Sequence, residues 1–101
     1  MKFRVNEADG LRELWHKGDA APLFRKLPRG VPEAFRKRLK LIKSATDERD
    51  MRAMKSLHYE RLERSETEHS IRLNDQWRLI VEWRDEGGDR YLWIEGIEDY
   101  H

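Results

Sequence analysis

The sequence contains no cysteine, and only three prolines and six glycines occur among its 101 residues. A chain without cysteine can form no disulfide framework and carries no thiol chemistry, which is compatible with a reducing compartment. No apolar run approaches the length needed to span a bilayer, and residues 1–6 lack the apolar segment of a signal peptide. These absences lead us to expect a cytoplasmic protein with no membrane contact.

Charge is plentiful but unevenly distributed. Charged residues make up 41% of the chain and apolar residues 38%, which predicts one small domain over residues 1–101 with a thin core. Residues 1–64 carry 17 basic and 10 acidic side chains, a net of +7, whereas residues 65–101 carry 4 and 10, a net of −6. Basic side chains are densest from Arg25 to Lys43. Such a stretch can bind phosphate groups, or it can be the solvated face of a helix.

The start of the chain predicts a short strand, a short helix and a connector. Residues 2–6 alternate polar and apolar side chains, as a half-buried strand does. Asp9 can cap a helix that ends near Gly18, where glycine allows the chain to turn away. Residues 22–28 follow as a connector between this helix and the next.

The clearest helix begins near Pro32. Proline suits the first helical position because no partner is needed there for a backbone N–H. Apolar residues then recur at the spacing of one helix face, and these residues are Phe35, Leu39 and Ile42. A further turn or two of helix is expected over residues 47–54.

From His69 onward the apolar pattern has a period of two, which is typical of strands. The predicted strands are residues 69–73, 77–83 and 91–97, and the turns between them are residues 74–76 and 85–89. On the last strand the alternation predicts one face made of Tyr91, Trp93, Glu95 and Ile97. The element order β-α-α-β-β-β predicts an α+β fold in which an antiparallel sheet packs against N-terminal helices.

Chemically capable side chains gather in the second half of the chain. They lie in three short segments, Leu57-His58, Asn74-Asp75-Gln76-Trp77-Arg78 and the closing Asp99-Tyr100-His101. Together the segments contain two imidazoles, a guanidinium group, a phenol and two carboxylates. Cleavage of a phosphodiester needs a base, an acid and fixed positive charge, and these groups can provide all three.

With these segments the chain resembles the RelE/ParE superfamily of bacterial toxins, and within it the HigB-like branch of type II toxin–antitoxin systems. The resemblance implies a ribosome-dependent endoribonuclease that cuts mRNA in the A site by metal-independent attack of the ribose 2′-OH. It implies an active site of His58, Arg61, Arg78, Asp99, Tyr100 and His101. The implied partners are the ribosome, mRNA and an antitoxin, commonly a helix-turn-helix protein of the HigA type, with no metal ion and no cofactor.

The basic stretch adds expected contacts with RNA or the ribosome. We expect these contacts from Arg36, Lys37, Lys40, Lys43 and Asn74. In the family the first segment usually continues Leu-His-Pro-Leu-Lys-Gly, whereas this chain has Leu57-His58-Tyr59-Glu60-Arg61-Leu62. The histidine is kept, an arginine replaces the lysine, and the proline and glycine are absent.

Side-chain chemistry indicates how the implied active site would divide the work. Histidine titrates near pH 6.5, so His58 and His101 are the candidates for moving protons. Arginine stays protonated, so Arg61 and Arg78 are expected to hold the phosphate. Two side chains complete the set: Asp99 would orient a neighbour, and Tyr100 would donate a hydrogen bond or stack on a base.

Other interpretations stay open. A ParE-like toxin shares the fold but acts by binding a protein such as gyrase, and a small RNA- or protein-binding module needs no catalytic groups at all. His16 and His69 are expected to be surface residues, and the four tryptophans to pack in the core or against the sheet. The histidines lack the spacing of a zinc site.

Overall fold

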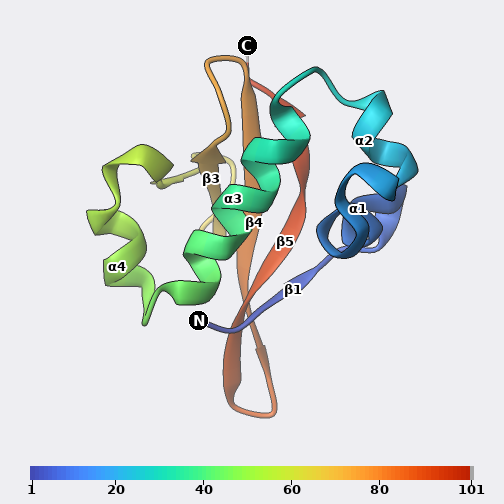
Figure 1. Ribbon diagram of the computed structural model, residues 1–101. Helices are drawn as coiled ribbons and strands as arrows, with labels where there is room; N and C mark the ends of the chain where they lie inside the picture. The colour runs from blue at the N-terminus through green and yellow to red at the C-terminus, as the bar shows by residue number, and fades with distance from the viewer. Residues whose placement is uncertain (101) are drawn as a thin grey trace.

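The structure is a computed structural model that describes residues 1–100, in which helices lie against one mixed β-sheet (Figure 1). The helices are α1 (Leu11–Lys17), α2 (Pro22–Lys26), α3 (Val31–Ser44) and α4 (Glu48–Ala53), with short 3-10 turns η1 (Ala8–Gly10), η2 (Gly18–Ala20) and η3 (Lys55–Leu57). The strands are β1 (Phe3–Val5), β2 (Glu60–Arg61), β3 (Glu68–Arg72), β4 (Trp77–Glu86) and β5 (Asp89–Asp99). The predicted α+β class is confirmed.

The sheet has the strand order β1-β5-β4-β3-β2. Strands β3, β4 and β5 form the antiparallel meander that the period of two predicted. Strand β1 joins the far edge parallel to β5, with Phe3 beside Leu92, so the sheet is mixed rather than wholly antiparallel. The two-residue strand β2 adds the opposite edge beside β3 and was not predicted.

Helix α3 crosses in front of the sheet (Figure 1) and forms for the reasons that its sequence indicated. Pro32 lies in its first turn, and Gly30 precedes the helix with a φ of 88°, a conformation that glycine adopts without strain. The predicted apolar face is fully buried: Phe35, Leu39 and Ile42 each have 0% of their surface exposed. Helix α3 is therefore the main apolar cover of the sheet.

Two predictions for residues 1–28 are wrong in detail. Asp9 does not cap α1, because the chain turns at Gly10 in the left-handed region and Asp9 itself has a φ of 58°. Residues 22–28 are not a simple connector, since Pro22 starts the short helix α2. Gly18 ends α1 as expected, with a φ of 59° and its N–H bonded to the Leu14 carbonyl. Helix α4 also follows its prediction, with Asp47 as the capping residue.

A β-bulge in β5 overturns the expected face of the last strand. Glu95 has no partner on β4, because Ile80 pairs with Gly96 whereas Val81 pairs with Ile94. The extra residue reverses the alternation, so Tyr91 and Trp93 lie on one face of the sheet, whereas Ile97 lies on the other and packs against the core with Leu92 and Ile94. The prediction of one face from residues 91 to 97 is therefore wrong.

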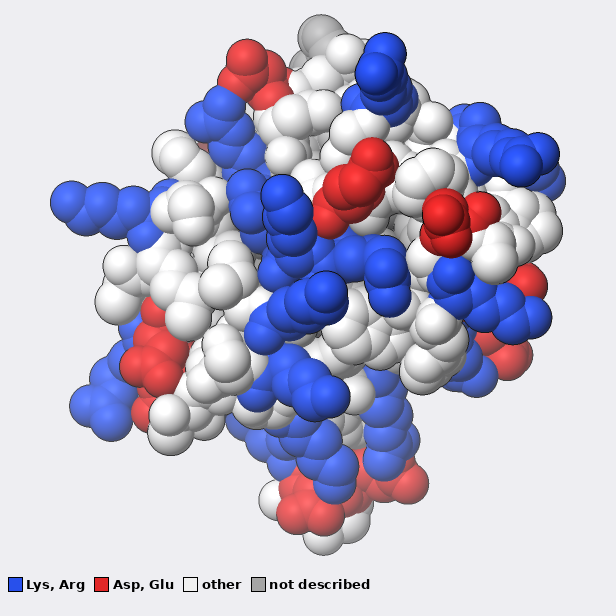
Figure 2. Space-filling view, viewed as in Figure 1, with Lys and Arg blue, Asp and Glu red and all other residues white. Residues whose placement is uncertain are grey.

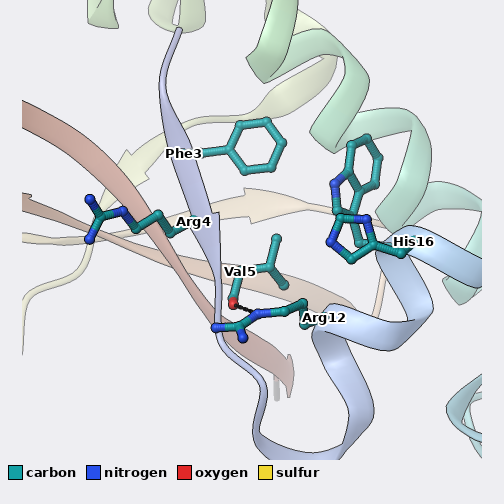
Figure 3. Close-up of a pocket in the computed structure, with 6 residues that line it drawn as sticks. Phe3, Arg4, Val5, Arg12 and His16 are labelled. Carbon is teal, nitrogen blue, oxygen red and sulfur yellow. Dashed lines mark hydrogen bonds between the residues drawn. The ribbon is translucent and has the colours of Figure 1, made fainter.

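The sheet has two different faces. On the helix-covered face, strand residues join the core, and these residues include Ile71, Leu79, Val81, Leu92 and Ile94. The opposite face, here called the open face, carries Arg4, Arg78, Glu82, Arg84, Tyr91, Trp93 and Glu98 by the strand registers. Figure 3 shows the alternation at β1, where Phe3 and Arg4 project to opposite sides. Within residues 1–100, no helix has both the length and the apolar character to cross a membrane.

Candidate functional site

The end of the described chain is held against the β3–β4 turn. Beyond the last strand pair, the Tyr100 N–H donates to the Gln76 carbonyl at 2.6 Å. The side-chain amide of Gln76 donates from Nε2 to Oδ2 of Asp99 at 3.1 Å. Two of the predicted catalytic residues, Asp99 and Tyr100, are thus fixed to one turn, whereas His101 lies outside the residues that the structure describes.

Asn74 builds that turn. Its Oδ1 accepts the backbone N–H of Gln76 at 2.9 Å and that of Trp77 at 2.8 Å, the local bonding that favours asparagine in turns. Asn74 remains exposed, so contact with RNA stays a prediction. The observed contacts give this side chain a structural task, which is to orient the turn that holds Gln76.

Arg78 connects the turn to a second segment of the site. Its side chain lies on the open face, with the guanidinium carbon 4.6 Å from the centre of the Tyr100 ring. Nη1 also donates a long hydrogen bond of 3.4 Å to the His58 carbonyl. Tyr100 is 51% exposed. Arg78 therefore links the loop of His58 with the C-terminal segment, although the three lie far apart in sequence.

His58 has an unusual backbone. Its φ of 45° and ψ of 52° place it in the left-handed region, which costs about 1–3 kcal/mol for a residue other than glycine. The residues on either side are buried, Leu57 fully and Tyr59 with 9% exposed. Burial of both neighbours holds the strained residue in place, and strain maintained in this way is common at functional sites.

Arg61 lies apart from Arg78. In the register of β2 and β3, Arg61 is opposite His69, whose side chain is buried on the helix-covered side of the sheet. The Arg61 guanidinium donates from Nη1 to the Ser65 carbonyl at 3.0 Å. The structure therefore brings His58, Arg78 and Tyr100 together, with Asp99 beside Tyr100 and bonded to Gln76, whereas the Arg61 guanidinium bonds to Ser65.

A hollow of about 440 Å³ adjoins the site on the open face. Its lining consists of Leu62, Arg64, Ile80, Glu98, Asp99 and Tyr100. Arg64 donates to both carboxylate oxygens of Glu98 at 3.3 and 3.4 Å. The hollow combines apolar walls with a charged rim beside the exposed Tyr100 ring.

His69 is buried, with 4% of its surface exposed, so the expectation of a surface residue is wrong. Its ring stacks parallel on Tyr59 at 4.5 Å between centroids. Nδ1 lies 3.2 Å from the Thr67 carbonyl, which can only accept, so we assign the proton to Nδ1. Nε2 lies 3.8 Å from Glu48. No local pattern indicates this burial, because Glu48 and Tyr59, which lie beside His69, come from distant segments.

Burial lowers the pKa of His69, and the hydrogen bond with the Thr67 carbonyl and the nearby Glu48 carboxylate only partly oppose this. A lowered pKa means that the unfolded chain binds a proton more readily than the folded one. The contribution of His69 to stability is therefore present above about pH 6.5 and is lost as the pH falls through the lower pKa of the folded state.

We expect the wild type to lose stability between pH 7 and pH 5, and His69→Phe, which keeps a flat ring beside Tyr59, to lose less. Denaturant unfolding followed by circular dichroism at several pH values measures this difference. Carboxylates that titrate near pH 4 affect both proteins alike. Equal slopes for wild type and variant from pH 7 to pH 5 would show that His69 titrates normally in the folded protein.

Basic side chains gather over α3 (Figure 2). Lys37, Lys40 and Lys43 are exposed there. Arg36 is instead half-buried and donates from Nε to the Trp15 carbonyl at 3.3 Å, close against Gly18. The α3 surface is thus formed mainly by its lysines, whereas Arg36 is committed to holding the end of α1.

His16 lies at another edge of the molecule. It lines a hollow of about 260 Å³ between β1 and α1, where the Arg12 Nε–H donates to the Val5 carbonyl at 3.0 Å (Figure 3). Strand β1 and strand β2 are opposite edges of the sheet, so His16 is separated from the loop of His58. His16 is exposed as expected and lies outside the site.

Among known families, the one described as the RelE-like toxin of the type II toxin–antitoxin system HigB matches residues 4–95. The chain therefore belongs to the HigB-like toxin family, and it is the toxin of a type II toxin–antitoxin pair, which implies an antitoxin partner. The match covers His58 and Arg78 but ends before Asp99. No curated protein and no solved structure matches the chain.

Proposed function

We propose that this toxin is a ribosome-dependent mRNA endonuclease that works without a metal ion. The observation that carries the proposal is the position of Arg78, whose guanidinium lies on the open face between the Tyr100 ring and the His58 carbonyl. A guanidinium group fixed beside an imidazole-bearing residue, a phenol and the Asp99 carboxylate suits RNA cleavage, which needs both proton transfer and charge stabilisation.

The proposed reaction begins when a base removes the proton of a ribose 2′-OH. The 2′ oxygen attacks the adjacent phosphorus, and the bond to the 5′ oxygen of the next nucleotide breaks as an acid protonates that oxygen. The products are a 2′,3′-cyclic phosphate and a 5′-OH. His58 and His101 are the proposed proton carriers, and Arg78 stabilises the charge that develops on the phosphorane.

The other members of the predicted site have supporting roles. Asp99, fixed by Gln76, orients a neighbouring group, and Tyr100 contacts a base or the phosphate. Arg61 is proposed only as a charge near the RNA path, because its guanidinium bonds to Ser65. The hollow beside Tyr100 offers room for a nucleotide next to the cleaved bond.

We propose that residues 1–101 act as one toxin domain in the cytoplasm, where the ribosome presents the mRNA. The lysines of α3 contact ribosomal RNA, and the antitoxin is a helix-turn-helix protein of the HigA type. Exposed lysine density on α3 supports the first of these, and the resemblance to HigB-like toxins supports the second.

Charge reversal on α3 tests the ribosome surface. The double variant Lys37→Glu with Lys40→Glu should bind ribosomes more weakly than the wild type and with a shallower dependence on salt, because fewer counterions are released. Both lysines are exposed, so thermal stability should change little. Ribosome pelleting across a salt series measures the affinity. Equal binding by the two proteins at every salt concentration would exclude this surface.

Induced expression without the antitoxin tests the function as a whole. We expect growth to stop and new mRNA 5′ ends to appear within reading frames, as mapped by primer extension. Growth arrest with intact mRNA and altered DNA supercoiling would instead support the ParE-like alternative. Normal growth together with intact mRNA would favour a binding module without catalytic activity.

A further inference from the structure

We propose that Tyr59 is a positioning residue for His58, acting through the backbone from the helix-covered side of the sheet. This inference rests on the proposed nuclease function. Residues 58–62 lack the proline and glycine of the family pattern, so the sequence alone does not indicate what fixes the conformation of this segment. In the structure the residue after His58 is held by a cluster of buried contacts, and these contacts replace the missing rigid residues.

The Tyr59 side chain is fixed in three ways. Its hydroxyl donates to Oε2 of Glu48 at 2.7 Å. The Tyr59 hydroxyl oxygen in turn accepts the indole N–H of Trp83 at 2.9 Å. Its ring lies parallel on the buried His69 ring at 4.5 Å. These partners come from α4, β4 and β3, so three elements hold one side chain.

Glu48 is itself restrained. Its carboxylate also accepts from the Trp83 indole at 3.2 Å and from Arg52 at 3.2 Å, and Arg90 lies 3.6 Å away. The pKa of Glu48 is lowered: burial raises it, but the bonds from Tyr59, Arg52 and Trp83 outweigh burial. Glu48 therefore stays ionised at neutral pH and keeps accepting the Tyr59 hydroxyl.

The geometry connects this cluster to His58. Leu57 is fully buried on one side of His58 and Tyr59 on the other, so the left-handed conformation between them has little freedom to relax. The His58 carbonyl faces Arg78, which lies on the open face. A change in the backbone at residue 58 would move both the imidazole and the acceptor of Arg78. The hydrogen bonds and the ring stacking of Tyr59 involve Glu48, Trp83 and His69, so we infer that its effect on His58 is one of positioning.

The first test compares Tyr59→Phe with the wild type in a ribosome-dependent cleavage assay. Phenylalanine keeps the ring on His69 but cannot donate to Glu48. We expect kcat to fall about tenfold with KM unchanged, because a misplaced reacting group weakens transition-state contacts and not binding. The matched control is Tyr91→Phe. Tyr91 is also buried, with 8% exposed, but it lies on the open face beneath Arg4 of the edge strand β1. Equal kcat values for wild type and Tyr59→Phe would overturn the inference.

The second test needs no activity and therefore separates the inference from the proposed function. In nuclear magnetic resonance spectra of the free protein, Tyr59→Phe should shift or broaden the His58 ring and backbone signals, and Tyr91→Phe should leave them unchanged. Unchanged His58 signals in Tyr59→Phe would overturn the inference even if the wild type cleaves RNA. If Tyr59→Phe does not fold, Glu48→Gln is measured in both tests, and the same results are expected. A wild type without cleavage would reject the nuclease function alone.

Discussion

Arg78→Ala is expected to slow mRNA cleavage by about 10²–10³-fold while the protein stays folded. The guanidinium group of Arg78 contacts both the His58 carbonyl and the Tyr100 ring. The pentacoordinate phosphorus gains negative charge as the 2′ oxygen attacks, and a guanidinium group stabilises such charge. Its removal takes away stabilisation that is largest in the transition state. Arg78→Lys should recover part of the rate, since it keeps the charge but loses the planar contact with Tyr100.

Arg84→Ala is the matched control for this prediction. Arg84 is on the same strand and face as Arg78, and its guanidinium carbon lies 4.4 Å from the centre of the Trp93 ring, much as Arg78 lies over Tyr100. The two arginines are six positions apart on β4, which corresponds to about 20 Å along the strand. Single-turnover cleavage of ribosome-bound mRNA should be lost in Arg78→Ala and kept in Arg84→Ala. Equal losses of cleavage rate in the two variants would mean that Arg78 supports the structure of the sheet and not the reaction.

His58→Asn is expected to lower the cleavage rate by about 10²–10⁴-fold, the usual effect of removing a general acid or base. Asparagine is chosen because it tolerates the left-handed backbone that His58 adopts, so the variant removes the imidazole with little change in the loop. The thermal midpoint should stay close to that of the wild type, and ribosome binding should be unaffected.

His16→Asn controls for the loss of any exposed histidine, because His16 lies beside β1 at the far edge of the sheet. We expect this variant to cleave mRNA at the wild-type rate. The pH dependence adds a second readout: the rate of His58→Asn should lose one limb of the wild-type pH profile. A wild-type rate in His58→Asn would leave His101 as the remaining candidate for proton transfer.

The sequence predicted the parts of the fold that local patterns encode. Helix α3 and the β3-β4-β5 meander follow from apolar spacing and turn residues. The bulge at Glu95 could not be predicted, because a single inserted residue leaves the alternation intact on either side of it. The parallel pairing of β1 with β5 depends on contacts between the two ends of the chain, which no local pattern contains.

The candidate site was predictable to a similar extent. Residue types indicate the segments of His58, Arg78 and Tyr100, and in the structure Arg78 contacts the His58 carbonyl and the Tyr100 ring. Asp99 lies beside Tyr100 and bonds to Gln76. The sequence does not predict on which face of the sheet Arg61 lies, since the two residues of β2 are too few to show an alternation. The burial of Tyr59 and His69 was missed for a related reason: their shared partner Glu48 comes from α4.

The chemical nature of the cleaved RNA ends tests the central claim most directly. Purified toxin is incubated with a defined mRNA, with and without programmed ribosomes, and both ends at each cut are identified. Attack by the ribose 2′-OH predicts a 2′,3′-cyclic phosphate and a 5′-OH, formed only when ribosomes are present and absent for Arg78→Ala. Cuts that carry a 3′-OH and a 5′-phosphate, or equal cutting of mRNA without ribosomes, would contradict the account.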